Sequence, residues 1–204
     1  MDHMPNKPII LLSHCLLNQT TRAEETITAL ATEKLLQLFS SYPIHLEQLS
    51  CPEFLFMGKR KKRTKDEWEK IPGFKKFCGE LADQIKEGVK RFDGKEAFPL
   101  VTIARSPCCA SGEVHPVRKG SVRNGGDDRE DYKGVRVGLK APSEFSNRVH
   151  IGKRIFADKG LLVEELEKRM KLELVEFDFR RVAESIERLK FFLEKKWVVF
   201  KEKL

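Results

Sequence analysis

The chain has 204 residues, of which 40% are hydrophobic and 34% charged, with a formal net charge of +8 and an isoelectric point near 9.2. This length and apolar content suffice for a substantial core, and we predict a single domain over residues 1–204. No apolar run reaches the roughly 18 residues of a membrane-spanning helix, and no secretory signal pattern is present. We therefore expect no membrane association and no secretion.

Five cysteines form an odd set in a chain of this size. Disulfide frameworks are typical of small secreted domains, whereas thiols stay free in a reducing compartment, so we expect a cytoplasmic protein. The positive charge is weak evidence for nucleic acid, because charged compositions rich in Lys and Glu are also typical of heat-adapted proteins. The first four residues, Met1–Met4, resemble the product of a cloning site and are left out of the fold prediction.

Strand and helix patterns alternate along the chain. Apolar runs predict buried strands, and apolar residues at helical spacing predict helices between them. The predicted strands are 8–14, 44–50, 98–102 and 172–178, and the predicted helices are 24–39, 74–92, 160–170 and 180–200. A helical pattern also begins at 66–68, while 147–157 fits a short helix or a loop and 132–139 an edge strand or hairpin arm. This alternation favours an α/β fold with three layers, in which helices cover both faces of a mostly parallel sheet.

Three of the predicted strands each run into a cysteine. Cys15 follows the first strand, Cys51 follows the second, and the pair Cys108–Cys109 follows the third. Neighbouring parallel strands lie about 5 Å apart, so thiols at their ends can meet at one metal or cluster. Ligands of such sheets bind at the carboxyl ends of the strands. The alternative is that these cysteines are structural, because free cysteine is often buried, and we assign Cys78 on a predicted helix to packing.

Several segments outside the strand ends are also candidates for function. Arg22 near a helix start is either a ligand contact or a solvated side chain. A loop rich in glycine and charge, 111–131, fits a lid over the cysteine edge, and His115 near its start is either a pocket residue or an ordinary loop residue. Six cations within Lys59–Lys65 form a solvated face or a phosphate-binding patch; the candidate nucleic-acid contacts are Lys59, Arg60, Lys61, Lys62 and Arg63.

Widely spaced thiols fit an iron–sulfur cluster better than zinc. Structural zinc sites use cysteines in closely spaced pairs, and these thiols lie more than thirty residues apart. Three thiolates on a cubane leave one iron without a protein ligand, and that iron can act as a Lewis acid toward a soft atom such as sulfur. Glu53 and Ser106, close in sequence to Cys51 and Cys109, are candidates for proton transfer.

The combined motifs resemble the thiouracil desulfidase family. The resemblance covers roughly the first 115 residues and lies in His14–Asn18 with Arg22, in Cys51–Glu53 and in Ser106–Cys109. It implies a [4Fe-4S] cluster that removes sulfur from a thiolated pyrimidine base, nucleoside or tRNA nucleoside, with oxygen from water in its place. On this match Cys15, Cys51 and Cys109 bind the cluster, Glu53 and Ser106 are catalytic, and Asn18 and Arg22 are candidate substrate contacts.

The chain departs from the family pattern at several positions. Asn18 replaces a glycine, Glu24 replaces an aspartate, and Cys108 and Ala110 flank Cys109 where the family has Ser and Gly. The third ligand is therefore either Cys108 or Cys109, and the chain resembles a diverged branch. The alternative function is an RNA-binding module in which the basic run binds phosphate and the cysteines pack or bind zinc. The sequence does not indicate the oligomeric state.

Overall fold

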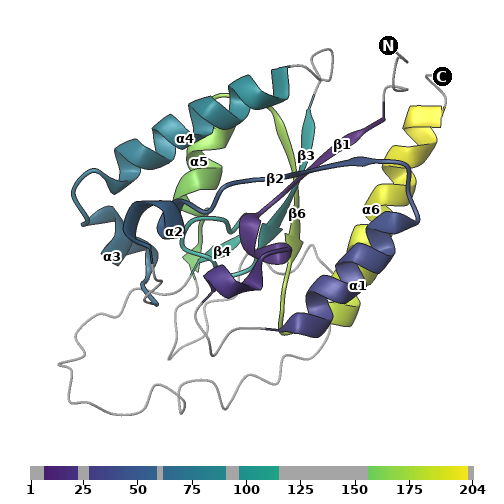
Figure 1. Ribbon diagram of the computed structural model, residues 1–204, viewed down its shortest axis with the longest axis horizontal. Coiled ribbons are helices and arrows are strands. Elements are labelled where there is room, and N and C mark those ends of the chain that lie inside the picture. The colour runs from purple at the N-terminus through teal and green to yellow at the C-terminus, as the bar shows by residue number, and fades with distance from the viewer. Residues whose placement is uncertain (1–6, 23–27, 59–61, 91–96, 115–155, 202–204) are drawn as a thin grey trace.

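A four-stranded parallel sheet forms the centre of the computed structural model, which describes residues 7–22, 28–58, 62–90, 97–114 and 156–201 (Figure 1). Its strands lie in the order β2-β1-β3-β6, and every neighbouring pair is parallel. The strands are β1 (Ile9–Leu12), β2 (His45–Gln48), β3 (Phe98–Ile103) and β6 (Leu172–Phe177). Strand β1 lies between β2 and β3, so the carboxyl end of β1 is next to the carboxyl ends of both β2 and β3.

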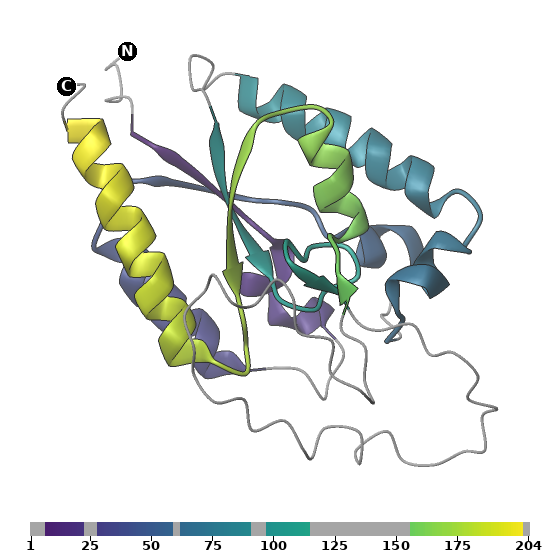
Figure 2. The same ribbon diagram turned by 180° about the vertical axis from the view of Figure 1, so that it is seen from behind.

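Helices cover both faces of this sheet (Figures 1 and 2). On one face lie α1 (Ala29–Ser40) and α6 (Val182–Lys201), which contact each other. The other face carries α4 (Phe74–Val89) and α5 (Leu161–Glu167), beside the short helices α2 (Pro52–Met57) and α3 (Lys65–Glu69). This arrangement confirms the predicted three-layer α/β fold. Among the helices of the described residues, none is long and apolar enough to cross a bilayer.

The central strands are buried on both sides, which explains why β1 is entirely apolar and β3 is apolar except for Thr102. All residues of β1 and β3 are buried, whereas the edge strand β2 alternates between partly buried and exposed residues. Successive side chains of a strand point to opposite faces, so Ile9 and Leu11 join the core beneath α4 and α5. Ile10 and Leu12 join the core beneath α1 and α6.

The structure differs from the sequence prediction at several boundaries. Helix α1 begins at Ala29, later than the predicted Glu24, and residues 23–27 lie outside the described residues. The six-residue helix α2 was not predicted, because a short apolar run after a proline has no helical periodicity that distinguishes it from a loop. Residues Phe156–Ala157, expected to be helix or loop, form strand β5.

Strand β5 pairs with the two-residue strand β4 (Glu113–Val114) in an antiparallel sheet of two strands. This pair joins the segment after the cysteine-bearing loop to the start of the chain leading into α5. Of the predicted lid 111–131, residues 111–114 are described: they end the cysteine-bearing loop and form β4. The rest of the predicted lid, the predicted edge strand 132–139 and His115 lie between β4 and β5 within 115–155, outside the described residues.

Candidate functional site

The exits of β1, β2 and β3 are linked to one another by hydrogen bonds. The amide of Leu49 donates to the carbonyl of Leu12 at 2.8 Å, and the amide of Ser13 donates to the carbonyl of Val101 at 3.0 Å. The Nδ1 atom of His14 lies 3.2 Å from the carbonyl oxygen of Leu49. The strand order reverses between β1 and β3, and parallel sheets bind ligands at the carboxyl ends of strands at such a reversal.

Three cysteines lie at this edge of the sheet. Cys15 is in the short 3-10 helix η1 (His14–Leu16), Cys51 immediately precedes α2, and Cys109 follows β3. Burial raises the pKa of Cys109 well above its ordinary value, and the nearby charges of Cys15, Cys51 and Glu53 raise it further, while a hydrogen bond with Ser13 lowers it. Cys15 and Cys51 are therefore near enough to Cys109 to interact with it electrostatically, and their binding of one shared metal or cluster stays a prediction.

The remaining two cysteines form a second, fully enclosed group. Cys15, Cys51 and Cys109 are 6%, 5% and 7% exposed, whereas Cys78 and Cys108 are 0% exposed. Burial raises the pKa of Cys108, and the charges of Glu53, Cys109 and Cys78 add to that rise. Burial also raises the pKa of Cys78 to about 12, with contributions from Glu165, Glu53 and Cys51. Of the two adjacent cysteines, Cys109 is the one whose pKa responds to Cys15 and Cys51 at the other strand ends, whereas that of Cys108 responds to Cys78.

Glu53 interacts with thiols of both groups. It is 3% exposed and occupies the first turn of α2, next to Pro52 at the start of that helix. Its charge raises the pKa of Cys78, Cys108 and Cys109, and its carboxylate hydrogen-bonds to the Cys108 thiol. A thiol can only donate to a carboxylate, so Cys108 orients a buried acid toward the cysteines.

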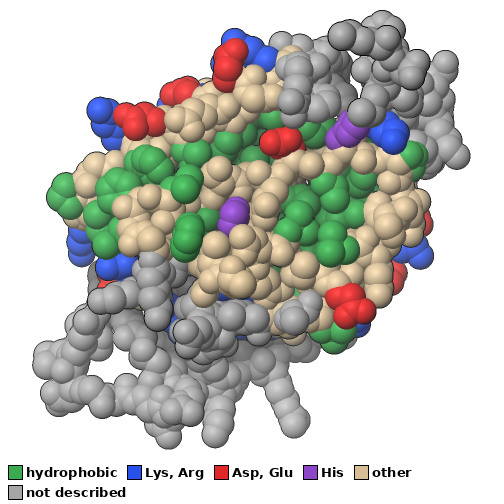
Figure 3. Space-filling view, in the orientation of Figure 1, with side chains coloured by type: hydrophobic (Ala, Val, Ile, Leu, Met, Phe, Trp, Pro, Cys, Tyr) green, Lys and Arg blue, Asp and Glu red, His purple; other side chains and the backbone are tan. Residues whose placement is uncertain are grey.

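Helix α2 divides its side chains between the interior and the surface. Glu53 points inward, while Phe54, Leu55 and Met57 are exposed. Figure 3 shows hydrophobic side chains gathered over this part of the molecule and, separately, over α1. The turn that presents Cys51 and Glu53 therefore also presents apolar surface beside the cysteine edge.

Ser106 shapes the loop that carries Cys109. Its Oγ atom accepts hydrogen bonds from the amides of Cys108 at 3.4 Å and of Cys109 at 3.0 Å, and its carbonyl accepts from the amide of Ala110 at 3.2 Å. These contacts occupy the acceptor side of the hydroxyl and fix the backbone around both thiols. The hydroxyl proton takes no part in these bonds, so Ser106 can still donate it to a ligand. The catalytic role expected for Ser106 stays a prediction.

The start of α5 supports the loop 106–112 from behind. Three consecutive amides, those of Gly160, Leu161 and Leu162, donate to loop carbonyls of Ala110, Pro107 and Cys108 at 2.9 to 3.0 Å. A Cβ atom on Gly160 would lie 2.2 Å from the carbonyl carbon of Cys108, so the two backbones approach too closely for any side chain. Sequence reasoning missed Gly160, although a glycine directly before an apolar helical run was its one visible signal.

The far end of the same loop is attached to β6. Glu176 Oε1 accepts hydrogen bonds from the amides of Ser111 at 3.1 Å and Gly112 at 3.2 Å. The hydroxyls of Thr102 and Ser111 lie 2.8 Å apart. With the contacts to α5, these bonds hold the backbone around Cys109 from two sides.

The two expected substrate contacts lie in loops with local partners. Asn18 is exposed, and its Oδ1 atom accepts from the hydroxyl of Thr20 at 2.7 Å. The guanidinium carbon of Arg22 lies 3.8 Å from the ring centre of Phe179, which follows β6. Neither of these contacts involves a cysteine, and a role in substrate binding stays a prediction for both residues.

The basic run is only partly a surface feature. Lys59, Arg60 and Lys61 lie outside the described residues, and Lys62 is exposed. Arg63 lies 4.9 Å from the centre of the Trp68 ring. Lys65 is buried and forms ion pairs with Asp158 at 2.8 Å and Glu164 at 2.5 Å. The end of the run is therefore part of the packing between α3 and α5, and phosphate binding by Lys59–Arg63 stays a prediction.

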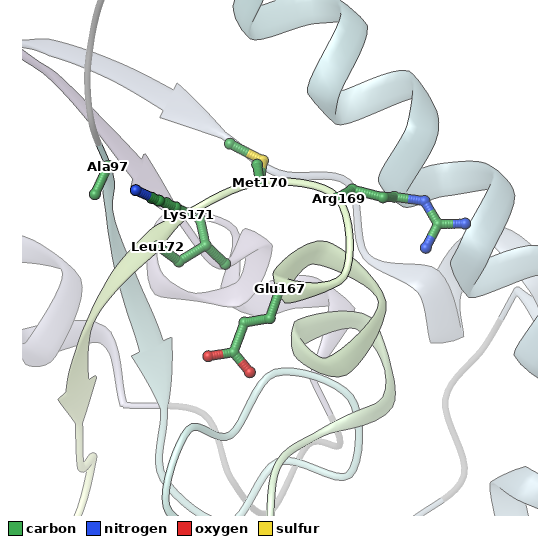
Figure 4. Close-up of a pocket in the computed structure, with 6 residues that line it drawn as sticks. All are labelled: Ala97, Glu167, Arg169, Met170, Lys171 and Leu172. Atoms are coloured by element: carbon green, nitrogen blue, oxygen red, sulfur yellow. The ribbon is translucent and has the colours of Figure 1, made fainter.

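A surface depression of about 570 Å³ lies elsewhere on the molecule (Figure 4). Ala97 precedes β3 and Leu172 begins β6, so the depression is at the amino ends of these strands, opposite the cysteine edge. Arg169, which also lines it, is already paired with Asp83 and Glu165. We therefore place the candidate site at the cysteine edge and not in this depression.

The arrangement of the thiols limits what they can hold. Within the part of the chain that the structure describes, no group of three or more His, Cys, Asp or Glu side chains is arranged to hold a single metal ion. A cubane cluster binds each thiolate at a different iron, so its ligands need not converge on one point.

Comparisons of the chain with protein families, with curated proteins and with solved structures find no match.

The close contact at Gly160 predicts a stability effect. We expect Gly160→Ala to lower the free energy of unfolding by roughly 1–3 kcal/mol, because the added methyl group overlaps the Cys108 carbonyl. Gly88→Ala is the matched control: nothing lies within 4 Å of its added Cβ, and alanine favours a helix interior over glycine by about 0.5–1 kcal/mol. Urea unfolding measures both; equal effects of the two substitutions would contradict the packing described here.

The buried thiols predict a loss of stability at high pH. Above pH 9.0, the ordinary pKa of Cys78, an unfolded chain loses thiol protons that the folded protein keeps until about 12. The unfolded state then binds fewer protons, so the free energy of unfolding of the iron-free protein should fall by up to about 1.4 kcal/mol per pH unit for each such thiol.

Unfolding of the parent protein and of Cys78→Ala between pH 8 and pH 11 isolates one of these thiols. In Cys78→Ala, the free energy of unfolding should fall less steeply with pH, by close to the 1.4 kcal/mol per pH unit that corresponds to about one proton. Other groups that titrate in this range, such as Tyr42, contribute equally to both proteins. Identical slopes would show that Cys78 is ionised or solvated in the folded state.

Proposed function

We propose that the protein is a [4Fe-4S]-dependent desulfidase that replaces the sulfur of a thiolated pyrimidine with oxygen from water. The observation that carries the proposal is the proximity of Cys15, Cys51 and Cys109 at the carboxyl edge of the sheet. These are the cysteines that the family resemblance assigns to the cluster. Each keeps a small exposed fraction, whereas Cys78 and Cys108 are enclosed.

The donor set suits a cluster that carries positive charge. Three buried thiols cannot all ionise beside one another without a cation, because burial and mutual repulsion raise the pKa of Cys109. Iron bound by Cys15, Cys51 and Cys109 would stabilise the thiolate forms. A cluster held by these three cysteines would have one iron without a protein ligand and would supply Lewis-acid chemistry toward the sulfur of the substrate.

The other residues of the site then have defined tasks. The buried carboxylate of Glu53 can take a proton from the attacking water and return it to the departing sulfur, so that C=S and water become C=O and hydrogen sulfide. The Cys108 thiol orients that carboxylate. Ser106 holds the backbone of Cys109 and has a hydroxyl proton to donate to substrate or water.

The substrate class follows from the resemblance and from the surface beside the site. A free base, a nucleoside and a tRNA thionucleoside share the same thiocarbonyl group, and the chemistry at Glu53 is the same for each. Exposed Phe54, next to Glu53, offers an aromatic face against which a pyrimidine ring can stack. Free thiols and an iron–sulfur cluster both fit a reducing cytoplasm, which is the compartment we propose.

Turnover of thiouracil by protein purified and reconstituted without oxygen tests this function. We expect thiouracil absorbance to fall as uracil and sulfide appear in equal amounts. Glu53→Gln keeps the shape of the side chain and removes its proton capacity, so turnover should fall by roughly 100-fold or more, the usual contribution of general acid–base catalysis, with an unchanged cluster spectrum.

The matched control is Glu165→Gln, which neutralises another buried carboxylate near the enclosed thiols, on α5. This variant should keep turnover within a few-fold of the parent protein once rates are divided by iron content. The proposed role of Glu53 fails if both variants keep parental turnover. The proposed reaction fails if the reconstituted parent protein releases sulfide from no thiolated pyrimidine.

A further inference from the structure

Arg105 has a backbone conformation that side chains normally avoid. Its φ is 62°, and among the described residues it alone combines a side chain with a positive φ. The residue follows the last residue of β3, Ile103, by two positions and directly precedes Ser106. A non-glycine residue in the left-handed region is strained, so the surrounding structure must hold it there.

The contact that holds Arg105 is an ion pair with Asp178, just beyond the end of β6. Its Nη1 atom lies 3.2 Å from Asp178 Oδ2, and Nη2 binds the same oxygen more closely. The two side chains are only 15% and 17% exposed, so the pair is shielded from solvent. Between the same two segments, the amide of Ala104 donates to the carbonyl of Phe177 at 2.9 Å.

Asp178 is itself firmly attached to the start of α6. Its amide donates to the Oγ atom of Ser185 at 3.0 Å, and its Oδ1 atom accepts from the amide of Arg180 at 2.9 Å. Ser185 is almost fully buried. The carboxylate that binds Arg105 is therefore fixed by its own backbone contacts and does not depend on Arg105 for its position.

The turn at Arg105 determines where Cys109 lies. Directly after it, the amide of Ser106 donates to the carbonyl of Ile103 at 3.2 Å, which reverses the chain. The Ser106 hydroxyl then accepts from the amide of Cys109 at 3.0 Å, and the carbonyl of Cys109 accepts from the amide of Ile103 at 3.0 Å. Without the left-handed turn, the chain would leave β3 in an extended direction and these contacts would not form.

We propose that Arg105 and Asp178 are positioning residues, which hold the strained turn after β3 so that the thiol of Cys109 faces those of Cys15 and Cys51. This inference rests on the proposed function, because holding the Cys109 thiol beside those of Cys15 and Cys51 serves a purpose only if the three thiols bind one cluster. The position of the thiol can nevertheless be measured without any cluster, so the two proposals can fail separately.

The test measures how fast N-ethylmaleimide modifies each cysteine in the folded, iron-free protein, by mass spectrometry of peptides. In the parent protein Cys109 reacts only through local opening of its loop. Loss of this charge-assisted contact in Arg105→Ala or Asp178→Asn should raise the rate at Cys109 by roughly 10-fold or more. The rates at Cys15 and Cys51, whose loops contain neither residue, should stay within about two-fold.

Two further variants separate positioning from general stability. Arg105→Gly loses the ion pair but adopts a positive φ without strain, so its rate at Cys109 should lie between those of the parent and of Arg105→Ala. Arg169→Ala removes ion pairs to Asp83 and Glu165, the first of which is more exposed than the Arg105–Asp178 pair, and should leave the rate at Cys109 unchanged even if the melting temperature falls.

The inference is overturned if Cys109 reacts at the parental rate in both Arg105→Ala and Asp178→Asn, or if all three cysteines accelerate together. If Arg105→Ala does not fold, the conservative Asp178→Asn decides. Iron uptake gives an independent readout: both variants should retain less iron than Arg169→Ala. A parent protein that takes up no iron would overturn the proposed function and leave the labelling result valid.

Discussion

The peptide bond between Cys108 and Cys109 packs directly against Gly160, and the candidate site depends on that contact. Consecutive amides at the start of α5 donate to the carbonyls of Pro107, Cys108 and Ala110, so the loop supplies the hydrogen-bond acceptors that the start of this helix needs. A methyl group at Gly160 would occupy the position of the Cys108 carbonyl. The loop and the helix therefore form one unit, and the cysteines are part of its packing.

Around this contact, the loop is attached at each end to the last strand of the sheet. Glu176 accepts hydrogen bonds from the amides of Ser111 and Gly112 at one end, and Asp178 binds Arg105 at the other. Both carboxylates lie at the carboxyl end of β6, two positions apart. The outcome is a loop whose two thiols have different neighbours: Cys108 hydrogen-bonds to Glu53 and interacts with Cys78, whereas Cys109 interacts with Cys15 and Cys51.

The sequence predicted the parts of this arrangement that depend on short segments. Buried runs in β1 and β3 have no polar alternation, which correctly predicted a parallel sheet covered on both faces, and the topology brings Cys15 and Cys109 to one edge. Parallel sheets place the carboxyl ends of their strands at one edge. The prediction that the cysteines after those strands are neighbours therefore requires only the strands and not the positions of the helices.

The supporting contacts could not be predicted, because their partners lie far apart along the chain. Arg105 meets Asp178 73 residues later, and nothing in the local sequence of either residue indicates this pairing. The same holds for Lys65, which looked like the end of a solvated basic run and is buried between Asp158 and Glu164. Helix α2 has too few residues for helical periodicity, so the sequence could not predict that Glu53 is buried.

The central claim, that the three cysteines at the strand ends bind a cluster and the two enclosed cysteines do not, is tested most directly by iron content. The parent protein, reconstituted without oxygen, should hold about four irons and four sulfides per chain. Alanine at Cys15, Cys51 or Cys109 should remove most of this iron, whereas alanine at Cys78 or Cys108 should leave it nearly complete. Iron that survives the loss of Cys109 and disappears with Cys108, or a parent protein that binds no iron, would contradict the claim.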